Sequence, residues 1–335
     1  MMNETNCDGG LIEMTSRKAV TNATLMMLLL LTLCVCSGVA QEAGQKTFAT
    51  PQDAGKALFD AVQSNGTTDD LAVLGASAAS LVSSGDEVQD KNNRETFLKR
   101  YQQMNRWAAE SNGNETLYIG AENWPFPIPL KKSSAGQWYF DTKEGTQEIL
   151  FRRIGKNEIS AIEVCEALAN AQQDYFQQLH DGSTVHQYAQ KILSDEGKQN
   201  GLYWKVAEGQ PESPIGPLVA HATAQGYGAS GGKPQPFHGY FYHTLKSQGP
   251  NAPGGAKNYV VNGNMTEGFA FVAYPAEYRN SGVMTFLVDA NGVVFQKDLG
   301  PNTVEIGKAM DSYNPDKTWT TTGLPPDEEE QQPTQ

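Results

Sequence analysis

The sequence predicts an α+β fold in which N-terminal helices precede a small antiparallel sheet, and a long helix then precedes a second antiparallel sheet. Apolar residues recur at helical spacing over residues 50–107, and short alternating runs broken by Gly, Pro and Ser follow over residues 117–141. The same order repeats, with a helical stripe after residue 157 and strand-like runs from residue 237 onward. Helices followed by antiparallel strands are typical of α+β proteins.

These two blocks predict two domains, at residues 47–155 and 156–317. The tail at residues 318–335 is acidic and rich in proline and glutamine, so we expect it to be disordered.

The N-terminus, residues 1–40, reads as a signal peptide. Arg17 and Lys18 precede an apolar run at residues 25–35, and a small-residue stretch ends at Ala40, where we expect cleavage. The run is shorter than the roughly 20 residues that a membrane-spanning helix needs. We therefore expect a periplasmic or secreted protein that has no transmembrane segment after cleavage.

Two alternatives concern this terminus. Met14 is a better start than Met1, because it lies directly before the basic region. Cys34 and Cys36 suggest a lipoprotein, but Leu33 and Val35 stand where a lipidation motif needs a small residue, which disfavours lipidation.

In the first domain, Thr50 is the expected cap of a helix with Pro51 in its first turn, and Asn65 ends it. A short second helix starts at Thr67. A third helix is expected over residues 92–107, with Phe97, Tyr101 and Met104 on its buried face, and strands follow at residues 117–120, 126–130 and 137–141.

In the second domain, a break at Gly155 precedes a long helix that Asn157 caps. We expect a further helix over residues 184–193 and a long loop over residues 197–236. The expected strands then lie at residues 237–245, 258–261, 268–274, 283–289 and 293–299. A hairpin turn at residues 289–292 joins the last two.

Charge and cysteine usage exclude several classes of protein. The formal net charge is −13, and no dense cluster of Lys and Arg stands out, so nucleic acid is excluded as a partner. Cys165 is the one cysteine beyond the leader, so the mature chain has no intramolecular disulfide. Its place on the apolar stripe indicates a buried residue.

Several segments carry a family resemblance: WPFPIPL from Trp124, WYFDT from Trp138, RRIGKNE from Arg152, GYFY from Gly239, and the stretch from YPAEY at Tyr274 to QKDLG at Gln296. On these segments, the chain resembles the bacterial family called domain of unknown function 2950 over about residues 47–320. The resemblance implies an exported bacterial protein. It implies no catalytic residue and no cofactor.

Two looser resemblances concern the fold. A long helix before a sheet that ends in SGVMTF at Ser281 and NGVVF at Asn291 is similar to the globular domains of type IV pilins and pseudopilins. Glu158, Glu163 and Glu166 on the helix depart from a pilin's apolar polymerisation helix. The first half is similar to the cystatin-like cone fold.

The candidate catalytic motifs have weak contexts. Ser230 fits G-x-S-x-G, but no apolar strand precedes it and prolines follow it. Lys233 after the same glycines lacks the Ser or Thr of a phosphate-binding loop. Glu144 and Glu148 could do acid/base work near Arg152 and Arg153, although an ion-pair network is favoured. The spacing of the five histidines does not favour a metal site, so we expect no metal or cofactor.

Aromatic side chains are the candidate ligand-binding residues. Trp124 and Trp138 lie in the first predicted sheet. Tyr240 and Tyr242 share one face of a predicted strand, so they could form an exposed aromatic platform.

The sequence therefore favours an exported protein of the bacterial envelope that is a non-catalytic binding or assembly module, with an envelope protein or a small ligand as its partner. A hydrolase that uses Ser230, with His221 or His238, or the pair Glu144 and Glu148 is one alternative. An accessory protein of a pilus or secretion system is another. The sequence specifies neither the ligand nor the oligomeric state.

Overall fold

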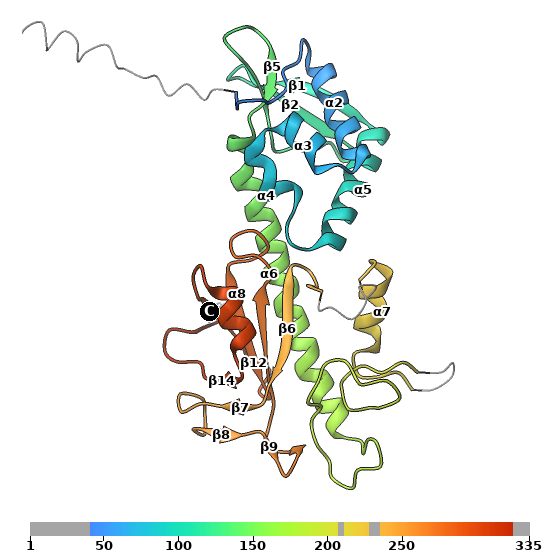
Figure 1. Cartoon of the computed structure of the whole chain (residues 1–335), viewed down its shortest axis with the longest axis vertical. Coiled ribbons are helices and arrows are strands. Elements are labelled where there is room, and N and C mark those ends of the chain that lie inside the picture. Colours follow the sequence, from blue (N-terminus) through green and yellow to red (C-terminus); the bar gives the residue numbers. More distant parts are fainter. Residues whose placement is uncertain (1–40, 207–210, 228–234, 324–335) are drawn as a thin grey trace, which may run out of the picture. The chain divides into compact units, whose positions relative to one another are not determined.

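The computed structural model describes residues 41–206, 211–227 and 235–323 (Figure 1). The expected leader, the motif around Ser230 and most of the expected tail lie outside the described residues. The described residues from Glu42 onward belong to one compact unit, and their apolar core comprises two clusters, one in each half. The predicted α+β class is confirmed, whereas the domain boundaries stay a prediction.

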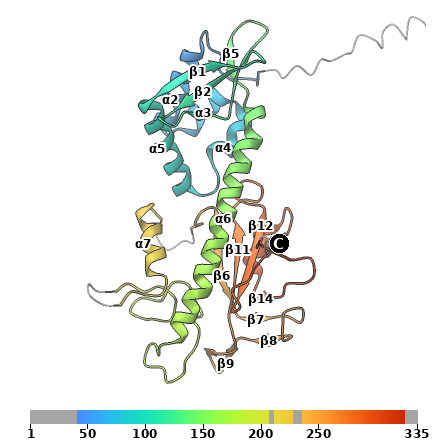
Figure 2. The ribbon, with the colours of Figure 1, turned by 180° about the vertical axis from the view of Figure 1, so that it is seen from behind.

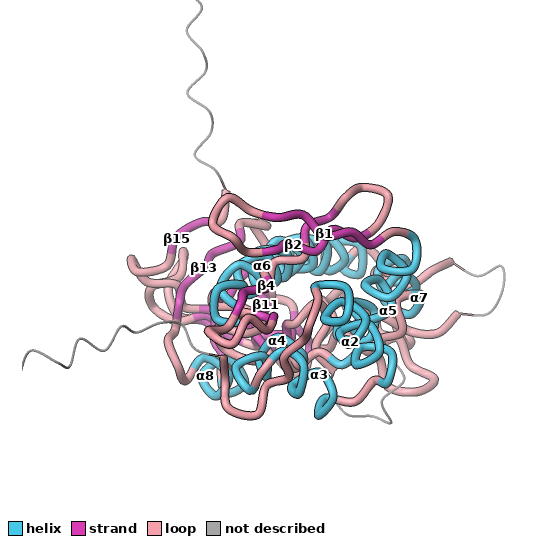
Figure 3. Tube along the Cα trace, turned by 90° about the horizontal axis from the view of Figure 1, so that it is seen from above, coloured by secondary structure: helices cyan, strands magenta, loops and turns pink. Residues whose placement is uncertain are grey.

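The N-terminal half packs short helices on a small antiparallel sheet. The helices are α2 (Pro51–Ser64), α3 (Thr67–Leu74), the 3₁₀ turn η1 (Ala76–Ala78), α4 (Ala79–Val82) and α5 (Glu87–Gln103). The strands are β1 (Asn105–Ala109), β2 (Glu115–Ile119), β3 (Trp124–Pro125), β4 (Leu130–Lys132) and β5 (Trp138–Phe140). The sheet order is β1-β2-β4-β5, and β3 pairs with β2. From above, β1 and β2 lie together, and α2 contacts α3 (Figure 3).

Capping explains the ends of α2. The Thr50 side chain accepts a hydrogen bond from the Asp53 amide, and Pro51 occupies the first turn. Asn65 ends the helix in the left-handed conformation, which asparagine tolerates better than most residues do. The predicted cap and end of this helix are confirmed.

The C-terminal half is built on the long helix α6 (Thr142–Phe176). Its main sheet has the order β15-β13-β12-β11-β6. These strands are β6 (Tyr240–Leu245), β11 (Ala270–Pro275), β12 (Met284–Asp289), β13 (Val294–Asp298) and β15 (Thr320–Thr321). The helix α6 packs on β11 and β12 (Figure 2), and α8 (Thr303–Ala309) also contacts β11.

Smaller elements complete this half. They are α7 (Gly216–Ala224), the strands β7 (Ser247–Gln248), β8 (Lys257–Asn258) and β14 (Ser312–Tyr313) of one small sheet, and the hairpin of β9 (Val260–Val261) and β10 (Asn264–Met265). The predicted turn between β12 and β13 is confirmed, because the Gly292 amide donates to the Asp289 carbonyl and Gly292 has a φ of +74°.

A buried polar junction joins the two halves. Asn157 Nδ2 donates to the Ser281 carbonyl at 2.9 Å, and Gln89 Nε2 donates to Asn157 Oδ1 at 2.8 Å. Asp86 Oδ2 accepts from the Gly239 amide at 2.9 Å. Gly239 has a φ of +74°, and a Cβ there would lie 2.4 Å from Asn157 Nδ2, so only glycine fits.

Two predicted helix boundaries were wrong. The predicted start of α6 after Gly155 is wrong, because Asp141 caps the helix at its true start and the helix runs through Gly155. Glycine costs a helix interior only about 1 kcal/mol, which the packing of α6 offsets. Asn157 is a buried junction residue rather than a cap. α5 starts earlier than predicted, at the cap Asp86, and ends before Trp107, which pairs with Leu117 in the sheet.

Other local predictions need correction. Residues 184–193 are not helical, since Tyr188 and Leu193 make isolated bridges to Met265 and Tyr203. The expected loop at residues 197–236 contains α7. The start of the expected tail forms β15, which pairs with β13. None of the helices in the described residues has the length and apolar character to span a membrane.

Candidate functional site

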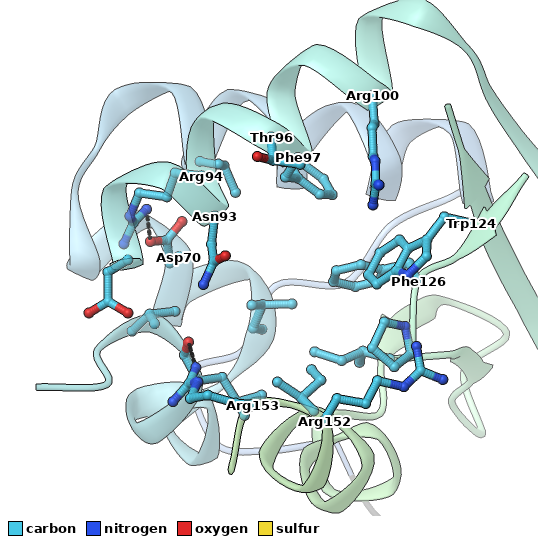
Figure 4. Close-up of a pocket in the computed structure, with 18 of the residues that line it drawn as sticks. Asp70, Asn93, Arg94, Thr96, Phe97, Arg100, Trp124, Phe126, Arg152 and Arg153 are labelled. Atoms are coloured by element: carbon cyan, nitrogen blue, oxygen red, sulfur yellow. Dashed lines mark hydrogen bonds and ion pairs between the residues drawn. The ribbon is translucent and has the colours of Figure 1, made fainter. Parts of the chain in front are cut away.

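A cavity of about 560 Å³ hollows the N-terminal half (Figure 4). Its walls come from α2, α3, α4, α5, the β2–β4 region and residues 149–157 of α6, so distant parts of the sequence meet there. Ligand sites in proteins typically have volumes of about 300–1,000 Å³. The cavity is therefore large enough for a small organic molecule.

Most of the wall is apolar. The aliphatic lining residues are Leu58, Val62, Leu74, Leu81, Val82, Ile119, Ile128 and Ile149. Three aromatic residues extend this surface: the ring centroids of Phe97 and Phe126 are 5.7 Å apart, and those of Phe126 and Trp124 are 6.3 Å apart. Such a wall favours a ligand with an apolar or aromatic body.

The helix α5 forms one wall of the cavity, although few of its own side chains are buried. Gln89 is its one buried residue within the described chain. Phe97 and Arg100, one turn apart, both line the cavity, and Figure 4 shows them entering from the same helix.

Five basic side chains also line the cavity, against two acidic ones. The basic residues are Arg94, Arg100, Arg152, Arg153 and Lys156, and the acidic residues are Asp70 and Asp90. A local excess of positive charge in a chain with a net charge of −13 favours an anionic ligand group.

The two carboxylates are engaged by the protein. Asp70 Oδ2 lies 2.7 Å from Arg94 Nη1, while its buried Oδ1 has no hydrogen-bond partner among the described residues. Asp90 Oδ2 accepts from the Ser84 amide at 2.9 Å. Burial raises the pKa of both Asp70 and Asp90, against the opposing effects of these partners.

The segments that carry the family resemblance all lie within the region that matches a known family. The family described as "Protein of unknown function (DUF2950)" matches residues 45–322. The chain belongs to this family. No curated protein and no solved structure matches it, so the pilin-like and cystatin-like likenesses gain no support from these comparisons.

In this DUF2950 member, the four predicted ligand-binding aromatics do not share one site. Trp124 lines the cavity. Trp138 is buried at 8% exposure in the same N-terminal sheet, with Lys132 Nζ 4.7 Å from its ring centroid. Tyr240 and Tyr242 lie on β6 in the other half.

The predicted exposed platform on β6 is wrong for Tyr240, which is fully buried. Its hydroxyl donates to the Met284 carbonyl at 3.0 Å, and its ring belongs to the same apolar cluster as Cys165 of α6. Tyr242 is partly buried and donates to the Phe237 carbonyl at 3.4 Å. The α6 helix that covers this sheet explains the burial. Ligand binding by these four residues stays a prediction.

The candidate catalytic carboxylates are in ion pairs. Glu144 Oε2 lies 2.6 Å from Lys131 Nζ, and Glu148 Oε1 accepts from Arg152 Nε at 2.7 Å. This agrees with the favoured ion-pair interpretation. Ser230 lies outside the described residues, so its chemistry stays untested.

The predicted burial of Cys165 is confirmed, and burial raises the pKa of its thiol well above the usual range. The histidines do not form a metal site in the part of the chain that the structure describes, where no three His, Cys, Asp or Glu side chains gather. His180 instead stacks on Tyr175, with ring centroids 3.8 Å apart.

The cationic wall of the cavity is not predicted by the sequence patterns. Phe97 was predicted to be buried, but Arg94 and Arg100 on the same helix gave no separate signal. Arginines one turn from a buried aromatic are the sequence feature that could have indicated it.

Proposed function

We propose that this DUF2950 protein is an exported, non-catalytic binding module of the bacterial envelope, and that its cavity holds a small, largely apolar ligand. The observation that carries the proposal is the cavity of about 560 Å³ with its aliphatic and aromatic wall. A leader with the features of a signal peptide supports export.

The lining residues favour binding over catalysis. Within the described chain they include no serine, cysteine or histidine, and their two carboxylates, Asp70 and Asp90, are bound by Arg94 and by the Ser84 amide. The one hydroxyl among them, on Thr96, donates to the Asn92 carbonyl at 2.8 Å.

The test uses the neutral fluorophore N-phenyl-1-naphthylamine with the full chain expressed in a bacterium. We expect saturable binding with one site per chain. Ile149→Trp places an indole at the cavity wall and should weaken binding at least tenfold. Ile159→Trp, at a position of α6 that is 62% exposed, is the matched control and should bind as the wild type does.

Absence of saturable binding, or equal binding by the two variants, would refute the proposed cavity function. Export is tested separately, by fractionation of cells that express the tagged chain and by N-terminal sequencing of the product. A product that starts at Gln41 would support the proposed localisation, and one that stays in the cytoplasm would contradict it.

A second candidate, an accessory role in a pilus or secretion system, is favoured by one observation. Phe151 is 68% exposed and Ile159 is 62% exposed on α6, and the space beside Gly155 between them is open. Exposed apolar side chains on one helix can bind a protein partner. Phe151→Glu with Ile159→Glu should then abolish co-purification of a pilus or secretion subunit, whereas Ile306→Glu should not.

A further inference from the structure

The arginines of the cavity fall into two groups, which differ in what they already bind. Arg94 Nη1 pairs with the buried Asp70 at 2.7 Å. Arg153 donates from Nη1 to the Ser80 carbonyl at 2.7 Å and from Nη2 to the Leu81 carbonyl at 2.7 Å. These two guanidinium groups are engaged by the protein and have little capacity left for a ligand.

Arg100 and Arg152 are much less engaged. The contact between Arg100 Nη2 and Glu122 Oε2 is 3.5 Å long, and the Glu122 side chain is 77% exposed. Arg152 donates from Nε to Glu148, while its two terminal nitrogens have no partner among the described residues. A guanidinium with free terminal nitrogens can bind a carboxylate or phosphate through two parallel hydrogen bonds.

Arg100 and Arg152 both lie near the aromatic residues of the cavity wall. The Arg100 guanidinium lies 5.8 Å from the centroid of the Trp124 ring. Figure 4 shows Arg100 entering from α5 and Arg152 from α6 on the opposite wall, with Trp124 and Phe126 between them in this view. The Asp70–Arg94 pair lies on the opposite side in this view.

Two less engaged cations, Arg100 and Arg152, therefore lie beside the aromatic part of the cavity wall. The same cavity has an aliphatic lining that includes Leu58, Leu74 and Ile119. A ligand that matches this pattern has one anionic head and one apolar chain. Glu122 and Glu148 should compete only weakly with an anionic ligand for these arginines, because ion pairs at the protein surface contribute little free energy.

We propose that the ligand is a single-chain amphiphile with a carboxylate or phosphate head, that Arg100 binds this head at the Trp124 side of the cavity, and that Arg152 on the opposite wall adds electrostatic attraction for the same negative charge. This inference rests on the proposed binding function. It specifies the chemical class of the ligand and the residues that select its head group.

The test measures displacement of N-phenyl-1-naphthylamine from the full chain by four probes with the same twelve-carbon chain: dodecanoate, dodecyl phosphate, dodecanol and dodecyltrimethylammonium. We expect one or both anions to compete about 10- to 100-fold better than dodecanol. The preferred anion identifies the head group. Shortening its chain should weaken competition about fourfold per methylene removed.

The double variant Arg100→Gln with Arg152→Gln should lower competition by the preferred anion to the level of dodecanol. An unchanged circular dichroism spectrum and urea midpoint show that the double variant is folded. Arg279→Gln is the matched control, because Arg279 is exposed and lies 5.4 Å from the Tyr278 ring centroid, as Arg100 lies over Trp124.

The outcomes separate the two proposals. Equal competition by dodecanol and the anions, a preference for the ammonium probe, or an anion preference that survives the double variant would overturn the inference while the binding function stands. Failure of the fluorophore to bind would remove the proposed function itself.

Discussion

The two apolar clusters of this protein are packed in opposite ways. In the C-terminal cluster, every residue of β11 is buried, and α6 and α8 both contact this strand. In the N-terminal cluster, a cavity of about 560 Å³ separates the walls, and α5 packs against the cluster through the partly buried Phe97 and Tyr101. A filled core is typical of a structural scaffold, whereas a hollow beside a lightly packed helix is typical of a binding region.

The comparison indicates that stability and binding are divided between the halves. The filled cluster should carry most of the free energy of unfolding, because large apolar side chains such as Phe271 and Phe286 are fully buried there. The hollow cluster should tolerate changes in its wall, since its side chains already face empty space.

The largest expected effect is on a residue of the filled cluster. Phe271→Ala should lower the free energy of unfolding by about 3–5 kcal/mol, because it leaves a cavity in a packed core. Phe97→Ala, in the cavity wall, should cost only about 1 kcal/mol. Urea unfolding followed by circular dichroism measures both. Equal losses would show that the two clusters do not differ as described.

Two neighbouring arginines of α6 should differ in their contribution to stability. Arg153→Met should cost about 2–4 kcal/mol, because the Leu81 carbonyl and Asn280 Oδ1 lose their donor in a largely buried junction. Arg152→Met should change stability by less than about 0.5 kcal/mol, since its ion pair with Glu148 is half-exposed. The same urea experiment measures both variants, and a stable Arg153→Met protein would argue against the junction as a source of stability.

Local signals predicted much of the fold. The Thr50 cap and the turn at residues 289–292 depend on neighbouring residues, which are visible in the sequence. The start of α6 was missed because Gly155 is an effective helix breaker only in isolation, whereas here the helix is held by its packing on the sheet. β15 was missed because its pairing with β13 joins distant segments.

The candidate site was less predictable than the fold. Trp124 was singled out, but the cavity it lines forms from five helices and a sheet that meet only in the folded chain. Arg152 and Arg153 have the same chemistry and adjacent positions. Their different rotation about the α6 axis leaves the terminal nitrogens of Arg152 without a partner among the described residues, whereas those of Arg153 donate to the Ser80 and Leu81 carbonyls. Sequence spacing alone does not specify that rotation relative to the rest of the protein.

The smallest expected effect concerns pH, at His238 beside the junction. Burial lowers the pKa of His238, and the positive charge of Lys156 lowers it further, against the opposing charges of Asp86 and Glu163. The unfolded chain, with a histidine pKa of about 6.5, then binds a proton more readily than the folded chain does. Stability should therefore fall as pH decreases below about 6.5 and through the lower folded pKa.

The variant His238→Asn isolates this contribution. Asparagine tolerates the positive φ of +51° at this position and does not titrate. The loss of stability between pH 8 and pH 5, measured by urea unfolding, should be smaller in this variant than in the wild type. His186→Asn, at an exposed histidine in the C-terminal half, should leave that loss unchanged. An equal pH dependence in all three proteins would show that His238 does not couple the junction to pH.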